Sequence, residues 1–108
     1  MRFAFSYCTS LASITFPEGA LTQLTTITDA FYNCTSLKDL TIYNLPNINL
    51  SATGLTTCTS LTLSSLQNIV NALPTTTSGY KCTIGTTNLA KLSDTDIQIA
   101  TDKGWTLN

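Results

Sequence analysis

The chain has 108 residues and a net charge of −1, and 43% of its residues are hydrophobic, which is enough for one folded domain with a single core. Its five basic residues are scattered, so the sequence offers neither the basic stripe needed to bind nucleic acid by charge nor a polybasic membrane anchor. No apolar run approaches the roughly 18 residues of a transmembrane helix, which argues against membrane insertion of this segment.

An eight-residue pattern occurs three times in the first part of the chain. The copies are residues 4–11, 30–37 and 54–61, and they align without gaps. Their cysteines, Cys8, Cys34 and Cys58, lie 26 and 24 residues apart. This spacing falls in the range of leucine-rich repeats, and it indicates that each copy is one structural unit stacked on the next.

The first two copies continue into short strand patterns. Apolar residues follow with L-x-x-L-x-L spacing, as Leu11, Ile14 and Phe16 and again as Leu37, Leu40 and Ile42. Alternate residues of a strand share one face, so these side chains are expected to point into the coil from strands near residues 11–16 and 37–42. A second apolar group follows each strand, first Leu24 and Ile27, then Ile48 and Leu50.

These motifs resemble the BspA-type leucine-rich repeat, which occurs on surface proteins of bacteria and some protozoa. The resemblance covers residues 3–63, although Tyr43-Asn44-Leu45 is inserted before Pro46 and the pattern decays after Leu63. It implies an α/β fold, a leucine-rich-repeat solenoid of about two to three β-coils, with an extracellular or cell-surface location. Repeat sequence begins directly after Met1, so we expect the first repeat to be incomplete on its N-terminal side and any export signal to lie upstream.

Residues 64–108 have a different pattern, and we expect them to form a helix-strand-helix-strand cap in one compact unit with the repeats of residues 1–63. Ser64-x-x-Gln67 predicts a capping box at the start of a helix. Its apolar face is expected at i, i+3, i+4 and i+7, which are Leu66, Ile69, Val70 and Leu73. Pro74 is expected to end this helix.

The second half of the expected cap begins with a short strand. Tyr80, Cys82 and Ile84 alternate as one side of this strand. Ser93-x-x-Asp96 then predicts a second capping box, on a helix that ends at Gly104. A last strand should follow at residues 105–107, with Trp105 touching Ala100 and packing over the first helix.

No catalytic or metal-binding arrangement can be assembled from these residues. The chain has no His, so a Cys-His or Ser-His nucleophile is impossible. The repeat cysteines lack the clustering that zinc requires, and we interpret them as buried free thiols, with a disulfide between two of them as the less favoured alternative. Asp94 and Asp96 are expected near the N-terminus of a helix, where the helix dipole favours negative charge. No calcium-binding motif accompanies these residues or Asp102. We expect no enzymatic activity, no cofactor and no metal.

The candidate ligand-binding residues lie on the outward side of the second strand. They are Lys38, Asp39, Thr41 and Tyr43. An exposed Tyr is a common recognition anchor, and an ordinary surface residue is the alternative. The family resemblance implies a recognition module that binds protein or glycan ligands in adhesion. The alternative function is a structural spacer or a phage or prophage tail-fibre component that stacks end to end.

The first complete strand, near Leu11 to Phe16, is expected to form a sheet edge with unpaired backbone groups. Another coil or another subunit would cover such an edge. The sequence therefore also predicts possible self-association through this N-terminal edge.

Overall fold

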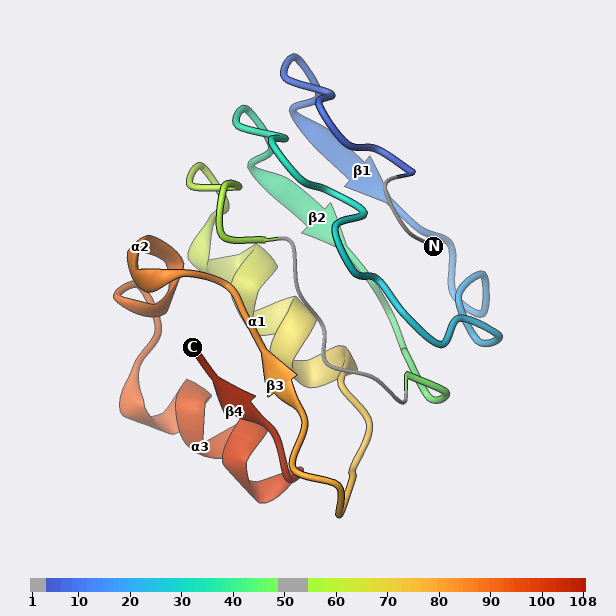
Figure 1. The fold of residues 1–108 in the computed structure, drawn as a ribbon, viewed down its shortest axis with the longest axis vertical. Coiled ribbons are helices and arrows are strands. Elements are labelled where there is room, and N and C mark those ends of the chain that lie inside the picture. The colour runs from blue at the N-terminus through green and yellow to red at the C-terminus, as the bar shows by residue number, and fades with distance from the viewer. Residues whose placement is uncertain (1–3, 49–54) are drawn as a thin grey trace.

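The computed structural model describes residues 4–48 and 55–108, which form a body of 36 × 30 × 20 Å. Its elements are β1 (Ser13–Thr15), β2 (Asp39–Thr41), α1 (Leu63–Ala72), β3 (Lys81–Cys82), α2 (Thr86–Leu89), α3 (Asp94–Asp102) and β4 (Thr106–Leu107) (Figure 1). The four elements predicted after residue 63 occur in the predicted order, with α2 as an addition. Leu50 and Gly54, which the sequence placed in the second and third repeats, lie outside the described residues.

The first two repeats form a pair of parallel strands that lie side by side in Figure 1. β1 pairs with β2 so that Ser13 is opposite Asp39 and Thr15 is opposite Thr41. Each residue of the first repeat therefore pairs with its equivalent in the second repeat. Leu40 and the following Ile42 are 1% exposed, which confirms that the apolar positions of the second strand point inward. Both strands are present where the repeat pattern put them, although each is only three residues long.

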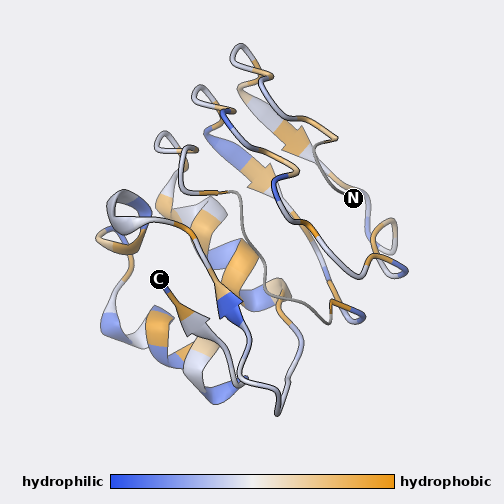
Figure 2. Cartoon of the chain, viewed as in Figure 1, coloured by the Kyte–Doolittle hydropathy of each residue, from blue (hydrophilic) through white to orange (hydrophobic). Residues whose placement is uncertain are grey.

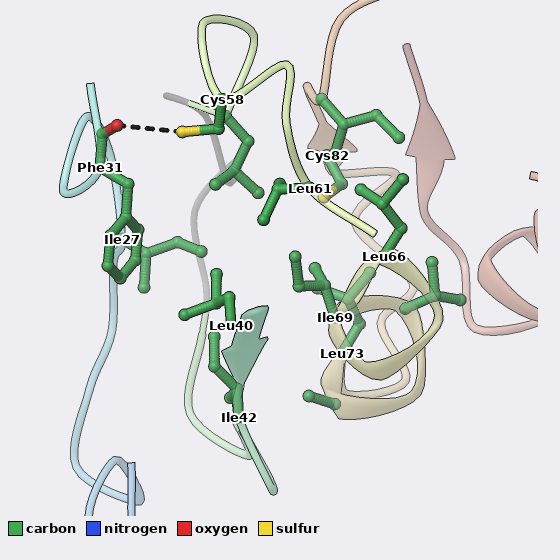
Figure 3. Packing of buried hydrophobic residues seen from close by; sticks show 14 of the residues in the cluster. Ile27, Phe31, Leu40, Ile42, Cys58, Leu61, Leu66, Ile69, Leu73 and Cys82 are labelled. Atoms are coloured by element: carbon green, nitrogen blue, oxygen red, sulfur yellow. Dashed lines mark hydrogen bonds between the residues drawn. The ribbon is translucent and has the colours of Figure 1, made fainter. Parts of the chain in front are cut away.

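Each copy of the eight-residue pattern folds into the same backbone turn around its cysteine. The Cys N–H in each copy donates to the carbonyl three residues earlier, with N···O distances of 3.2 Å for Cys8, 3.0 Å for Cys34 and 3.0 Å for Cys58. The cysteine side chain joins successive repeats. Cys34 Sγ donates to the Phe5 carbonyl at 2.9 Å, and Cys58 Sγ donates to the Phe31 carbonyl at 3.1 Å (Figure 3). A small side chain with a weak donor suits this tight position between coils.

Helix α1 covers the edge of β2 that faces away from β1. Thr62 N–H donates to the Lys38 carbonyl at 3.0 Å, at the position where a third strand would begin. Beyond it, Ser65 Oγ accepts from Leu40 N–H at 3.0 Å and donates to the Lys38 carbonyl at 3.0 Å, while Asn68 Oδ1 accepts from Ile42 N–H at 2.6 Å. Side chains of the helix therefore satisfy the strand edge that would otherwise be open.

The predicted capping box at Ser64 is wrong. The N-cap of α1 is Thr62, whose hydroxyl accepts from Ser65 N–H at 3.2 Å. Thr62 has the extended backbone of an N-cap, whereas Ser64 is already inside the helix. Gln67 is too far along the helix to reach this cap, and its amide donates to the Asp96 carboxylate of α3 at 3.3 Å. Before Pro74 the helix ends as expected, with Leu73 in an extended conformation.

The second predicted capping box is confirmed. Ser93 Oγ accepts from Asp96 N–H at 3.2 Å, and the Asp96 carboxylate accepts from Ser93 N–H at 3.1 Å. The Ser93 backbone bond lowers the pKa of the Asp96 carboxyl from its ordinary value of 3.8, and bonds from the Ser93 and Gln67 side chains act in the same direction.

This cap predicts how stability depends on pH. A carboxyl with a depressed pKa in the folded state contributes stability above its unfolded pKa, and the contribution is lost as pH falls through the folded value. We therefore expect the free energy of unfolding to decrease as the pH is lowered below about 4. Urea midpoints measured from pH 7 down to pH 2 should fall more steeply for the wild type than for Asp96→Asn. Parallel curves for the two proteins would contradict this assignment.

Helix α3 ends at Asp102 and is followed by the predicted Schellman motif, in which Gly104 is the left-handed residue. Trp105 N–H donates to the Ala100 carbonyl at 3.0 Å, and Gly104 N–H donates to the Thr101 carbonyl at 2.9 Å. Gly104 has φ +88°, and a Cβ added there would lie 1.9 Å from the Thr76 carbonyl oxygen. Both the positive φ and this close backbone contact therefore require glycine. Lys103 Nζ closes the end of α1 by donating to the carbonyls of Val70 at 3.1 Å and Asn71 at 2.8 Å.

One apolar core runs through the strands and the helices. Figure 3 shows Leu40 of β2 and the following Ile42 facing Ile69 of α1 and its C-cap Leu73 across this core. Figure 2 shows that β1 and β2 each carry polar and apolar segments. β3 and β4 form a second parallel pair, with Cys82 opposite Leu107. Helix α1 contacts both β2 and α3. The division into repeats 1–63 and a cap at 64–108 remains a prediction.

Candidate ligand-binding surface

The four residues that the sequence singled out lie on β2 or immediately beside it. Lys38 and Asp39 are exposed, Thr41 is half-buried, and Tyr43 is 55% exposed. Leu40 and Ile42, which alternate with Asp39, Thr41 and Tyr43, are buried. Lys38 has the same parity as Leu40 and lies just before the strand. The strand therefore separates the side chains that hold the core from the side chains that meet solvent.

Pairing with β1 widens this surface by two residues that sequence reasoning did not include. Ser13 lies opposite Asp39 and Thr15 opposite Thr41, and both Ser13 and Thr15 are exposed. We call these six residues the strand surface: Ser13, Thr15, Lys38, Asp39, Thr41 and Tyr43. The signal for the two additions was present in the sequence, because Ser13 and Thr15 occupy the repeat positions of Asp39 and Thr41.

A second exposed aromatic group lies on the turns before the repeat cysteines. The rings of Tyr7 and Tyr32 meet edge to face, with centroids 5.7 Å apart and an interplanar angle of 79°. Tyr7 is 67% exposed and Tyr32 is 37% exposed. Tyr7 and Asn33 have φ of +62° and +60°, so the turn holds equivalent residues of two repeats in the left-handed region. The two tyrosines occupy different repeat positions, since Tyr32 is equivalent to Ser6, and the stacking of successive turns brings their rings into contact.

The buried thiols are expected to be unreactive near neutral pH. Cys34, Cys58 and Cys82 are buried and free, and burial raises the pKa of Cys58 to about 11 and of Cys82 to about 12. Near neutral pH these thiols are protonated, and a protonated thiol is a poor nucleophile. Among residues 4–48 and 55–108 no group of three or more His, Cys, Asp or Glu side chains is arranged to hold a metal ion, and no pocket is found there.

Cys8 departs from the prediction that the repeat cysteines are all buried. It is half-buried, whereas the equivalent Cys34 and Cys58 are 0% exposed. The reason is its position at the end of the stack, since in the described part of the chain no earlier repeat covers it. The four cysteines are free, so no disulfide joins the described repeats.

These differences predict a clear order of thiol reactivity. In the native protein we expect a maleimide to modify Cys8 first, while Cys34, Cys58 and Cys82 react only after unfolding, because burial shields them and keeps them protonated. Mass spectrometry of peptides from timed reactions, with and without denaturant, measures each site. Equal native rates at Cys8 and Cys58 would refute the buried arrangement.

The family comparison agrees with the repeats found in the sequence. A model of the BspA type leucine-rich repeat region, which comprises six copies, matches residues 1–98. The match extends beyond residue 63 and includes α1, β3 and α2. Neither a curated protein nor a solved structure matches the chain. None of the helices in the described ranges has the length and apolar character needed to span a bilayer.

Proposed function

Because the chain belongs to the BspA-type leucine-rich-repeat family, we propose that it is a non-catalytic recognition module of a bacterial cell-surface or secreted repeat protein. In this proposal its coils continue as a solenoid, and it binds a protein or glycan ligand in adhesion. The ligand contacts the strand surface. Solenoids present extended faces of this kind, with one row of side chains contributed by each repeat.

One observation carries the proposal. The one-repeat register of β1 and β2 places Ser13 beside Asp39 and Thr15 beside Thr41 on the solvent side. The core positions between them are occupied by apolar residues, including the buried Leu40. Side chains on the strand surface can therefore differ between proteins without disturbing the core. A fold with this separation suits recognition.

Tyr43 is the side chain on this surface that we expect to contribute most to binding. A tyrosine offers a large rigid ring and a hydroxyl, and it loses little conformational entropy when it is held by a ligand. Its ring can stack on a sugar or on an apolar protein side chain. The neighbouring hydroxyls of Ser13, Thr15 and Thr41 add hydrogen-bonding groups, and Lys38 and Asp39 add one charge of each sign.

The structure gives the end-to-end stacking alternative less support. Stacking of one chain on the C-terminal side of another would require free backbone groups on the last strand of the sheet. On β2 those groups are bonded to Ser65 and Asn68 of α1. A spacer or fibre component would have to use another contact at this end.

Binding measurements test the proposal. The wild-type chain is first applied to a glycan array and to an array of purified secreted host proteins, and affinities for bound probes are then measured for variants. We expect Tyr43→Ala to weaken binding by about 10-fold or more, as for an interface hot spot. Thr41→Ala should change the free energy of unfolding by less than about 0.5 kcal/mol.

Tyr7→Ala is the matched control, because it removes an exposed tyrosine from a turn outside the strand surface. It should leave the affinity unchanged. If Tyr7→Ala abolishes binding while Tyr43→Ala has no effect, the ligand contacts the turns and the proposal for the strand surface is wrong.

A further inference from the structure

An asparagine of α1 is fixed beside the end of β2. Asn68 Oδ1 accepts from Ile42 N–H at 2.6 Å. Because a backbone N–H can only donate, this bond also assigns the two branches of the amide, with the oxygen toward β2 and the nitrogen as the other branch. Ile42 is followed directly by Tyr43, whose side chain is 55% exposed. The Asn68 amide is therefore held one residue away from the tyrosine of the strand surface.

The nitrogen of this amide is open to solvent. Within the described ranges the side chain of Asn68 makes the bond to Ile42 and no other, so Nδ2 has no partner there. No buried side-chain donor in those ranges lacks a partner, which means that Nδ2 is not buried. Ser64 and Asn71 lie on the same side of the helix and are exposed, while Asn68 is half-buried. The amide thus lies at the margin of α1 with two N–H donors free.

The free groups at this margin favour one kind of ligand group. Asn68 offers donors, since its oxygen is already engaged, and Tyr43 offers the face of an aromatic ring. A hydroxyl matches this pair less well, because it both donates and accepts and has no apolar part. A carbonyl that carries a methyl group matches both residues, since its oxygen accepts from the amide and its methyl packs on the ring. The acetyl group has these two parts.

Charge and shape restrict the molecule that can carry this group. No charged residue occurs from Leu40 to Tyr80, so a charged ligand finds no partner in this segment. No pocket is found in the part of the chain that the structure describes, which favours a chain of units lying along the surface over a small molecule in a cavity. In residues 38–48 and 55–73, the exposed large hydrophobic side chains are those of Tyr43 and Leu63. A protein partner therefore finds little apolar surface for the core of an interface.

We propose that the ligand of the strand surface is a glycan that contains N-acetylated amino sugars. The acetamido methyl group packs on the Tyr43 ring, and the acetamido carbonyl accepts from Asn68 Nδ2. The bond to Ile42 fixes the donor before the ligand arrives, so little conformational entropy is lost on binding. This inference rests on the proposed function, because it names the ligand class of the same surface, and it adds Asn68 as a specificity-determining residue.

Two oligosaccharides that differ only in the acetamido group test the ligand class. Tetramers of N-acetylglucosamine and of glucose can be compared with the same linkage and length, so that an acetamido group in one replaces a hydroxyl in the other. We expect the N-acetylated tetramer to bind at least about 10-fold more tightly, because it adds a hydrogen bond and an apolar contact. NMR titration of the isotope-labelled chain to millimolar ligand measures both affinities, and the side-chain amide signal of Asn68 should move. Equal affinities, or no binding of either tetramer, overturn the inference.

Substitutions at the two residues test the contact itself. Asn68→Asp keeps an oxygen for Ile42 N–H but replaces the donor with an oxygen that repels a carbonyl, so it should weaken binding of the N-acetylated tetramer by about 10-fold. Tyr43→Ala should weaken it to a similar extent, because the ring is lost. Asn71→Asp is the matched control, since it makes the same change of charge at an exposed position of the same helix and should leave the affinity unchanged. The urea midpoint of Asn68→Asp should stay close to that of the wild type, which separates a lost donor from a lost fold.

The outcomes separate this inference from the proposed function. If Tyr43→Ala weakens binding while Asn68→Asp binds as the wild type does, the strand surface remains the site and the acetamido contact is wrong. The same conclusion holds if a protein without glycans binds through Tyr43 and the N-acetylated tetramer does not bind. If neither substitution changes the affinity for a bound ligand, the strand surface is not the site and both proposals fail.

Discussion

Trp105→Ala is expected to lower the free energy of unfolding by about 3–5 kcal/mol, the range for removing a buried aromatic side chain. Trp105 is 1% exposed, and its ring lies 5.4 Å from that of Tyr80. Its Nε1–H donates to the Pro74 carbonyl at 2.7 Å, just beyond the end of α1. The residue thus joins the ends of α1 and α3 to the strand that closes the chain.

This loss is large compared with the total stability of roughly 5–15 kcal/mol that small domains have. Urea denaturation measures this loss. Circular dichroism must follow the unfolding, because Trp105 is the single tryptophan and its fluorescence is lost in the variant. Trp105→Phe is the matched control. It keeps an aromatic ring but leaves the Pro74 carbonyl without its donor, so it should cost less than the alanine change. An unchanged midpoint for Trp105→Ala, together with lost ligand binding, would mean that Trp105 belongs to a binding site and not to the core.

The sequence predicted the order of the elements because apolar periodicity and repeat spacing are local signals. The strands around Ile14 and Leu40 and the helix with Ile69 and Val70 follow directly from such patterns. The start of α1 was harder to predict, because Thr62, Ser64 and Ser65 can all cap a helix. The choice among them is made in space, where Ser65 is held between Lys38 and Leu40 of the neighbouring strand.

Contacts between segments far apart in the sequence leave no such local signal. Ser65 and Asn68 cover the edge of β2 from about 25 residues away, and no spacing rule indicates that polar helix side chains replace a strand there. For the candidate ligand-binding residues, alternation along the strand was enough to place Asp39 and Tyr43 on the solvent side. Whether they bind a ligand remains a prediction.

Helix α2 and its buried Asn88 were not anticipated, because four residues are too few for a periodic pattern. The Asn88 amide donates to the carbonyls of Leu55 and Cys58, each at 3.2 Å, and to that of Ile84 at 2.9 Å. Leu55 is the third-repeat equivalent of Phe5 and Phe31, whose carbonyls accept from cysteine thiols. In the first two repeats, this carbonyl accepts from the thiol of the cysteine one repeat later. In the third repeat, the Asn88 amide takes the place of that thiol.

Asn88→Ala is accordingly expected to lower the free energy of unfolding by about 3 kcal/mol, because it removes three buried hydrogen bonds of roughly 1 kcal/mol each. The carbonyls of Leu55 and Cys58 keep their backbone donors, which are the N–H groups of Cys58 and Leu61. Asn88 is 0% exposed, so water cannot readily replace the amide. Asn88→Asp, which has nearly the same shape, separates hydrogen bonding from packing. At neutral pH it should destabilise at least as much as alanine, because a carboxylate would face the same carbonyls even though Lys91 Nζ lies 3.2 Å from the Asn88 Oδ1 position.

Asn71→Ala provides the control for both changes, since it removes an exposed asparagine side chain from α1 and should alter stability by no more than about 0.5 kcal/mol. Urea midpoints of the three variants at one pH give the comparison. A large loss for both Asn88 variants beside a small one for Asn71→Ala fits an amide that holds the last coil through its hydrogen bonds. If Asn88→Asp proves as stable as the wild type, the amide hydrogens are not needed at this position, and packing alone must join the third repeat to α2.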